Sequence, residues 1–142
     1  MKRLNRKGFT LVELLAVIVI LAIVVGIALT TVLPTLKKSR QNAFELTADT
    51  AADFFEKQYS LYLIGENTYD FSSGLSGTMG ENEFKSAGLK ASNYTSTGNT
   101  WSIDENSGRA CVHLIAATRA NSGDNAGEYY DVDPSTKDSS GC

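Results

Sequence analysis

The segment that most constrains this chain is a long apolar run placed directly after a basic block near the N-terminus. The run is unbroken from Leu14 to Leu29, and with its flanks it covers the 25 residues from Phe9 to Leu33. As an α-helix this stretch is roughly 37 Å long, which exceeds a hydrocarbon core of about 30 Å. The sequence therefore predicts a transmembrane helix over residues 9–34. By the positive-inside rule, its cytoplasmic end carries Lys2, Arg3, Arg6 and Lys7.

A glycine separates the basic block from the apolar run. An ordinary secretory signal peptide has a shorter apolar region, of about 7 to 15 residues, followed by a small-residue cleavage site. Here the small residue, Gly8, comes before the apolar run. Cleavage after Gly8 would remove residues 1–8 as a leader and leave the apolar helix on a mature protein that begins at Phe9.

Glu13 is an acidic residue at the start of the apolar run, with no basic residue inside the run to pair with it. An ionised carboxylate in hydrocarbon is costly unless it is paired, and intramembrane acidic residues usually mark function. One interpretation is a plain single-pass anchor, in which Glu13 lies near the interface and its side chain reaches water. The other is a carboxylate with a functional partner.

The residues Lys7-Gly-Phe-Thr-Leu-Val-Glu13, followed by the long apolar run, closely resemble the processing site and N-terminal helix of type IV pilins and the related pseudopilins. The resemblance covers Lys7 to about Leu33, and beyond that it is one of layout. It implies that a prepilin peptidase cuts between Gly8 and Phe9 and methylates the Phe9 amine. It also implies the pilin fold, an α+β fold in which a long N-terminal helix packs on a small antiparallel sheet.

The resemblance further implies that Glu13 serves assembly. A free α-amine is largely protonated at neutral pH. Within one helix Phe9 and Glu13 are one turn apart and could pair. In a staggered bundle the Phe9 amine of an incoming subunit would instead meet Glu13 of a neighbour, which would neutralise both charges and set the register of the helices. The implied partners are other pilin subunits, the prepilin peptidase and an inner-membrane assembly platform.

Gly26 and Pro34 mark the weakest stretch of the predicted helix. Pro34 cannot donate a hydrogen bond to the carbonyl of Thr30, and its ring crowds that carbonyl. We therefore expect a kink at Pro34. The β-branched residues between the two positions weaken this stretch further. Pilins often carry a helix-breaking residue in this region that lets the segment melt in the filament, and here the proline lies a little further along than is common.

Residues 35–142 are expected to form one small extracellular head. An apolar stripe at helical spacing predicts an amphipathic helix over residues 35–64, with Gly65 as its stop. The stripe is expected to be core rather than a ligand site. Its members are Phe44, Ala48, Ala51, Phe55, Tyr59 and Tyr62.

The rest of the head is predicted to form a loop followed by strands. Residues 66–99 are rich in glycine and are expected to form an irregular connection with one short helix over residues 81–87. Residues 100–104 and 109–118 predict a hairpin, and residues 128–132 a third strand, within a C-terminal region spanning residues 100–142. The sheet would pack on the helical stripe, and the expected contributors are Trp101, Val112, and Leu114 or Ile115.

The two cysteines favour a disulfide, since the resemblance places the head outside the cytoplasm. Cys111 lies in the second predicted strand and Cys142 is the last residue, so a bond between them would close a loop of 32 residues. By the loop-entropy relation such a link stabilises by roughly 3.5 to 4 kcal/mol. The alternative is one buried thiol and one incidental terminal thiol. A disulfide-closed C-terminal loop is common among pilins.

Composition argues against several other classes of function. Four of the thirteen basic residues lie in the leader, so nine basic and sixteen acidic residues remain, and no nucleic-acid partner is expected. No nucleophile, base and oxyanion donors can be assembled, so no catalytic residue, cofactor or enzyme activity is predicted. His113 is interpreted as a packed or surface imidazole. Acidic residues gather near the C-terminus, where oxygen ligands for Ca²⁺ or a solvated loop are the alternatives: Asp124, Glu128, Asp131, Asp133 and Asp138.

The sequence is thus interpreted as a prepilin. It would be a precursor in the cytoplasmic membrane of a bacterium, and its mature form would be a structural subunit of a cell-surface filament of the kind that serves adhesion and motility. One alternative is a pseudopilin of a type II secretion or competence DNA-uptake system. Another is a membrane-anchored extracellular binding domain that never polymerises.

Overall fold

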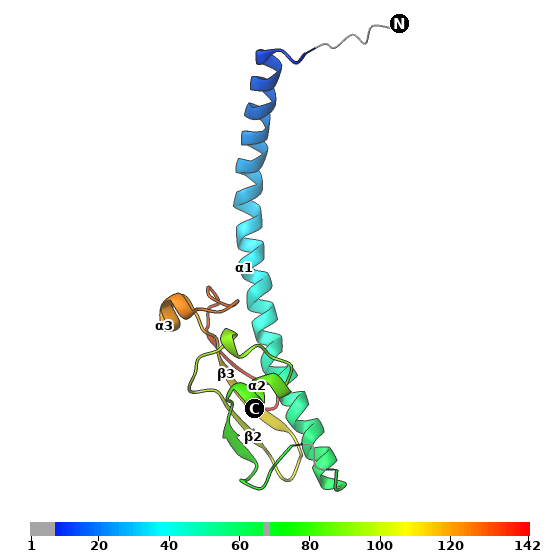
Figure 1. The fold of residues 1–142 in the computed structure, drawn as a ribbon. Coiled ribbons are helices and arrows are strands. Elements are labelled where there is room, and N and C mark those ends of the chain that lie inside the picture. The colour runs from blue at the N-terminus through cyan, green and yellow to red at the C-terminus, as the bar shows by residue number, and fades with distance from the viewer. Residues whose placement is uncertain (1–7, 67–68) are drawn as a thin grey trace, which may run out of the picture. The chain divides into compact units, whose positions relative to one another are not determined.

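The computed structural model describes residues 8–66 and 69–142 (Figure 1). The chain divides into two compact units, one ending at Leu36 and the other running from Lys37 to Cys142. The sequence places the boundary after Pro34. Helix α1, Leu11–Leu63, contributes to both units. The predicted α+β class, a long apolar N-terminal helix with an antiparallel sheet, is confirmed.

The first unit is the apolar part of α1. Its large aliphatic side chains, from Leu11 to Leu33, are all exposed. The helix is long and apolar enough to cross a membrane by its length and composition. The aliphatic surface has no partner within the described part of the chain, so it is available to lipid or to another helix.

The second unit, which we call the head, begins with the remainder of α1. Five of the six predicted stripe positions are buried, and Ala52 joins them: Phe44, Ala48, Ala51, Phe55 and Tyr59. Tyr62 was wrongly assigned to the core, since 42 % of it is exposed. It lies in the last turn of the helix, where its ring contacts those of Tyr59 and Phe71 but stays partly open to solvent.

Helix α1 ends at the predicted glycine. Gly65 has a φ of 86°, a left-handed conformation that a residue with a side chain rarely adopts. The amide of Gly65 donates to the carbonyl of Tyr62, and the amide of Glu66 donates to that of Leu61. These two bonds form a Schellman motif, which satisfies carbonyls that the helix leaves unpaired.

Four antiparallel strands form one sheet in the order β1-β2-β3-β4. They are β1 Ser76–Thr78, β2 Thr100–Ile103, β3 Ala110–Ile115 and β4 Thr136–Asp138. The predicted hairpin is β2 and β3, with Trp101 paired to Val112. The burial of β3 alternates strictly, and its inward side chains face the helical stripe. In Figure 1 both central strands lie beside the C-terminal part of α1.

The turn between β2 and β3 is closed by its own polar groups. The amide of Asn106 and the hydroxyl of Ser107 donate to the carboxylate of Asp104, at 2.9 and 3.0 Å. These bonds stabilise the ionised form and lower the pKa of Asp104. Gly108, with a φ of 70°, takes the left-handed position that lets the chain return.

Two strand predictions require correction. Residues 128–132 form a turn instead of a strand. Tyr129 and Val132 are both buried, and a strand could not place these two side chains on one face, because they are three residues apart. The outer partner of β3 is β4 instead. Strand β1 lies inside the predicted irregular connection, residues 66–99, of which residues 67–68 fall outside the described residues. The predicted short helix is confirmed as α2, Glu81–Ser86.

Short helical turns complete the head: η1 Ala91–Asn93, α3 Arg119–Ser122 and η2 Gly123–Asn125. The core is largely aromatic. The rings of Phe55 and Trp101 stack with centroids 4.5 Å apart, and those of Phe84 and Tyr94 stack at 4.6 Å. Burial raises the pKa of Tyr94. Trp101, Val112 and Leu114 are core residues as predicted, whereas Ile115 is half-buried.

The C-terminal residues are held against β3 and α1 by hydrogen bonds. The amide of Val112 donates to the hydroxyl of Ser139 at 2.9 Å, and the amide of Ser140 donates to the carboxylate of Asp49 at 2.6 Å. Gly141 packs so closely on the backbone of Ala110 that a Cβ atom would overlap the Ala110 carbonyl oxygen. The last residues therefore fit only if position 141 lacks a side chain.

Replacing Gly141 with alanine is expected to lower the free energy of unfolding by about 1 to 3 kcal/mol, because a backbone carbonyl cannot move aside cheaply. The measurement is urea unfolding of the full chain in detergent micelles, followed by the fluorescence of the single tryptophan, Trp101. Ser140→Ala is the matched control, since that side chain is exposed. Equal unfolding midpoints for the two variants would contradict the close packing of Gly141.

Candidate functional site

The predicted cleavage junction lies in exposed, non-helical chain just before α1. Residues 8–10 have no regular secondary structure, and Phe9 is 92 % exposed. A Cβ built on Gly8 would meet nothing within 4 Å. The Gly8–Phe9 bond is therefore accessible to an enzyme that acts on extended chain. Residues 1–7 of the predicted leader lie outside the described residues.

Glu13 and Thr10 form a reciprocal pair at the start of α1. The backbone amide of Thr10 donates to Oε2 of Glu13 at 2.8 Å, and the backbone amide of Glu13 donates to Oγ1 of Thr10 at 3.2 Å. This is a capping box, in which two amides that lack helical partners are satisfied by side chains. A carboxylate has about four acceptor positions, so Glu13 keeps capacity for a further donor.

Thr10 was not singled out in the sequence. The signal that could have found it is a threonine three residues before a glutamate at the start of an apolar run, which is the sequence pattern of a capping box. The pairing ties Glu13 to the residue next to Phe9. An acceptor carboxylate is thereby held beside the position where cleavage would create a new amine.

The two predicted helix-break positions, Gly26 and Pro34, both lie within α1. Around them three threonine hydroxyls donate to carbonyls of the preceding turn, each at 2.8 to 3.0 Å: Thr30 to Ile27, Thr31 to Ala28, and Thr35 to Thr31. These bonds offer carbonyls of this stretch a side-chain donor in addition to the helix ladder. Melting of this stretch in an assembled filament stays a prediction.

Cys111 and Cys142 are joined in a disulfide, with their Cα atoms 4.6 Å apart. The bond fixes the last residue to β3. Together with the bonds of Ser139 and Ser140, it attaches the C-terminal segment to β3 and α1 at three residues. On β3 the imidazole of His113 pairs through Nδ1 with Asp138 of β4, so this histidine is a cross-strand partner in the sheet.

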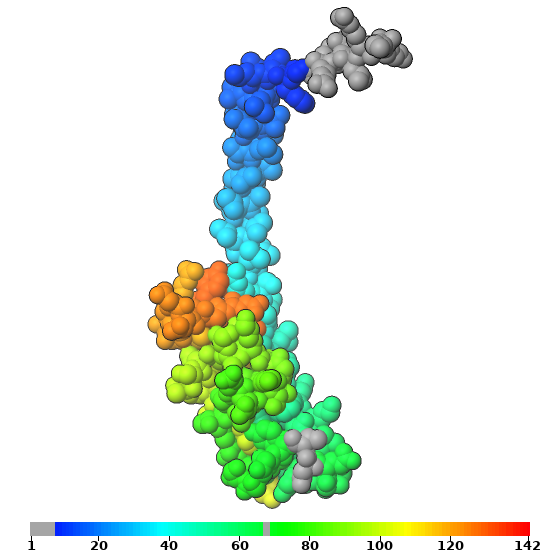
Figure 2. Space-filling view, in the orientation of Figure 1, coloured from blue at the N-terminus to red at the C-terminus, as the bar shows by residue number. Residues whose placement is uncertain are grey.

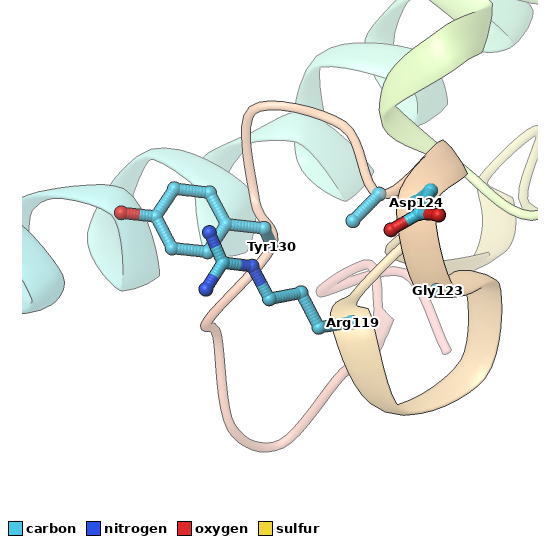
Figure 3. A pocket seen from close by; sticks show the side chains of 5 residues that line it. Arg119, Gly123, Asp124 and Tyr130 are labelled. Atoms are coloured by element: carbon cyan, nitrogen blue, oxygen red, sulfur yellow. The ribbon is translucent and has the colours of Figure 1, made fainter.

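The acidic C-terminal region also contains a cluster of rings and cations. The guanidinium groups of Arg40 and Arg119 lie 4.5 and 4.6 Å from the ring centre of Tyr130, and Arg40 pairs with Asp131 at 3.0 Å. Figure 3 shows Arg119 against the Tyr130 ring, with Asp124 on the other side of a hollow of about 530 Å³. Within residues 8–66 and 69–142, no three potential metal-ligating side chains of Asp, Glu, His or Cys come together.

The comparisons with known proteins bear on the N-terminal segment. The family model of the prokaryotic N-terminal methylation motif matches residues 3–29. The matched range contains the predicted cleavage junction, the capping box and the first part of the apolar helix. A search of curated proteins finds no match, and a search of solved structures finds none either.

Proposed function

We propose that this chain, which carries the N-terminal segment of a type IV pilin-like prepilin, matures into a structural subunit of an extracellular filament. The observation that carries the proposal is the match to the methylation motif over residues 3–29, a range that includes the start of a helix whose large aliphatic side chains are exposed. A single anchor needs only to span the bilayer. A surface of this kind can also pack against copies of itself once it leaves the lipid.

Processing comes first in this proposal. The precursor sits in the cytoplasmic membrane, prepilin peptidase cuts the exposed bond between Gly8 and Phe9, and the Phe9 amine is methylated. The mature chain then keeps its apolar helix and gains a cation beside the capping box of Thr10 and Glu13. An assembly platform in the inner membrane would deliver it to the growing filament.

Assembly uses Glu13 and Phe9 as the pairing groups. The spare acceptor positions of Glu13 bind the Phe9 amine of the neighbouring subunit, so that both charges are paired inside the helix bundle. Identical head-to-tail contacts that do not close into a ring generate a helical filament. Gly26 and Pro34 lie where the helix would open, and the hydroxyls of nearby threonines would cover carbonyls that the open form exposes.

A pseudopilin of a secretion or DNA-uptake machine is the second candidate, because the methylation motif fits it equally well. A pseudopilin would be processed in the same way but would stay in a short, cell-associated fibre. The amount of processed protein released from cells by shearing distinguishes the two. A non-polymerising anchor would stay wholly in the membrane fraction.

Replacing Gly8 with valine is expected to block processing and to abolish filaments, since the peptidase would meet a branched side chain at the residue before the cut. The open space around Gly8 means that the substitution leaves the described fold intact. The measurement is the mass of the membrane-bound protein, which should retain residues 1–8. Gly26→Ala is the control, because its Cβ also meets nothing within 4 Å and it should be cleaved normally. Normal cleavage of the Gly8→Val chain would contradict the assigned junction.

A further inference from the structure

A polar cleft of about 640 Å³ lies on the head between the segment that precedes β2 and the short helices α3 and η2. In Figure 2 the surface of residues 119–125, in orange, adjoins that of residues 90–97, in yellow-green. None of its lining residues carries a formal charge, although one residue in five of the whole chain is charged. All but Ala117 carry a hydroxyl or a carboxamide: Ser92, Tyr94, Thr95, Ser96, Asn121, Ser122 and Asn125.

Both walls of the cleft are held in place by asparagine side chains. On one wall the carboxamide of Asn121 accepts from the amide of Thr118 at 2.9 Å and donates to the carbonyl of Ala116 at 2.8 Å. On the other, the buried Asn99 accepts from the amide of Ile115 at 2.7 Å and donates to the carbonyl of Thr95 at 2.7 Å. The cleft is therefore formed before any ligand arrives, which is usual for small-molecule sites.

Several groups in the cleft remain available to a ligand. Three side chains make no hydrogen bond with any residue that the structure describes: Ser92, Ser96 and Asn125. The hydroxyl of Ser122 donates to Asn121, and its oxygen can still accept a hydrogen bond. Hydroxyls and carboxamides both donate and accept. An anion or a cation placed here would lose its hydration without meeting an opposite charge. The matching ligand is neutral and carries groups that likewise both donate and accept.

A second hollow of about 440 Å³ adjoins the first and shares the segment around Ser92 and Ser96. Its lining includes the apolar residues Met79, Phe84 and Ala91 and one charged residue, Glu81. The Glu81 carboxylate can accept hydrogen bonds from the hydroxyl groups of a neutral ligand, and it would repel an anion. A sugar ring has hydroxyl groups at its rim and apolar C–H groups on its faces, so the pair of hollows suits more than one ring. We propose that this double cleft binds a neutral oligosaccharide. The proposal requires a folded head and does not depend on filament assembly.

The test is saturation-transfer NMR on the full chain, held in lauryldimethylamine oxide micelles because that detergent has no sugar headgroup. The probes are N,N′-diacetylchitobiose, cellotriose and maltotriose, with a sulfated disaccharide as the charged comparison. We expect transfer to at least one neutral probe, with a dissociation constant on the order of 1 mM. Absence of transfer to all three from the folded chain, or stronger binding of the sulfated probe, would overturn the proposal.

A double variant locates the site. Ser96→Ala with Asn125→Ala removes two exposed side chains that make no hydrogen bonds within residues 8–66 and 69–142, so the fold should be unchanged while binding weakens by about tenfold or more. Ser86→Ala is the matched control, because this exposed residue of α2 lies outside both hollows. Equal affinity of the double variant and the control would show that the sugar binds elsewhere, and it would refute the assignment of the binding site to this cleft.

Discussion

Replacing Glu13 with valine is expected to abolish filaments while the protein still enters the membrane. Insertion should be unchanged or easier, because the substitution removes a charge from the apolar segment. Assembly would leave the incoming Phe9 ammonium without a partner, a defect of about 3 to 5 kcal/mol per interface by analogy with broken buried pairs. The mutant must be the sole copy in the cell, and its amounts in the membrane and sheared fractions are both measured.

The capping box provides a matched control for this experiment. Thr10→Ala removes the hydroxyl that accepts from the amide of Glu13, a loss of about 0.5 to 2 kcal/mol in helix stability, but leaves the carboxylate in place. Filaments should therefore persist in Thr10→Ala and be lost in Glu13→Gln. If both variants lost filaments equally, the role of Glu13 would be to cap its own helix. Normal yield from Glu13→Val would show that the pairing is wrong.

Removal of the disulfide is expected to have the next largest effect. The double variant Cys111→Ser and Cys142→Ser should lose roughly 3.5 to 4 kcal/mol of unfolding free energy. The reason is that the disulfide closes the long loop from Cys111 to Cys142 and so restricts the unfolded chain. The fold should survive at low temperature, since Ser139 and Ser140 still bind β3 and α1. Urea unfolding in micelles measures the loss.

Reduction of the parent chain is the control for the disulfide prediction. It should give the same unfolding midpoint as the double variant, because both remove the same covalent link. A non-reducing digest of the parent chain should yield one linked peptide pair. Free thiols at both positions in freshly isolated protein, or an unchanged midpoint in the double variant, would contradict a stabilising role for this bond.

The parts of the fold that could be predicted are those with a strong periodic signal. The buried stripe from Phe44 to Tyr59 repeats at helical spacing, and the burial of side chains alternates along the strand around Val112. Both elements could therefore be predicted from the sequence. Tyr62 continues the same spacing but lies in the last turn of the helix, where it is 42 % exposed. Periodicity indicates which face of a helix is apolar, and it does not indicate where the neighbouring element ends.

The parts that were missed depend on pairing rather than on pattern. Strands β1 and β4 have three residues each and no apolar alternation, so only their neighbours β2 and β3 define them. The turn at residues 128–132 is apolar enough to suggest a strand, but Tyr129 and Val132 enter the core from a bend. At the candidate site, Gly8, Phe9 and Glu13 were predicted from one motif, whereas Thr10 was identified from its hydrogen bonds with Glu13.

The most direct test of the central claim is the intact mass and N-terminal residue of the protein recovered from sheared cell-surface material. A filament subunit processed at the assigned junction should begin at Phe9, carry one additional methyl group on its amine, and retain the link between Cys111 and Cys142. Protein that begins at Met1, or that is cut beyond Leu29 so that the apolar helix is lost, would contradict the account.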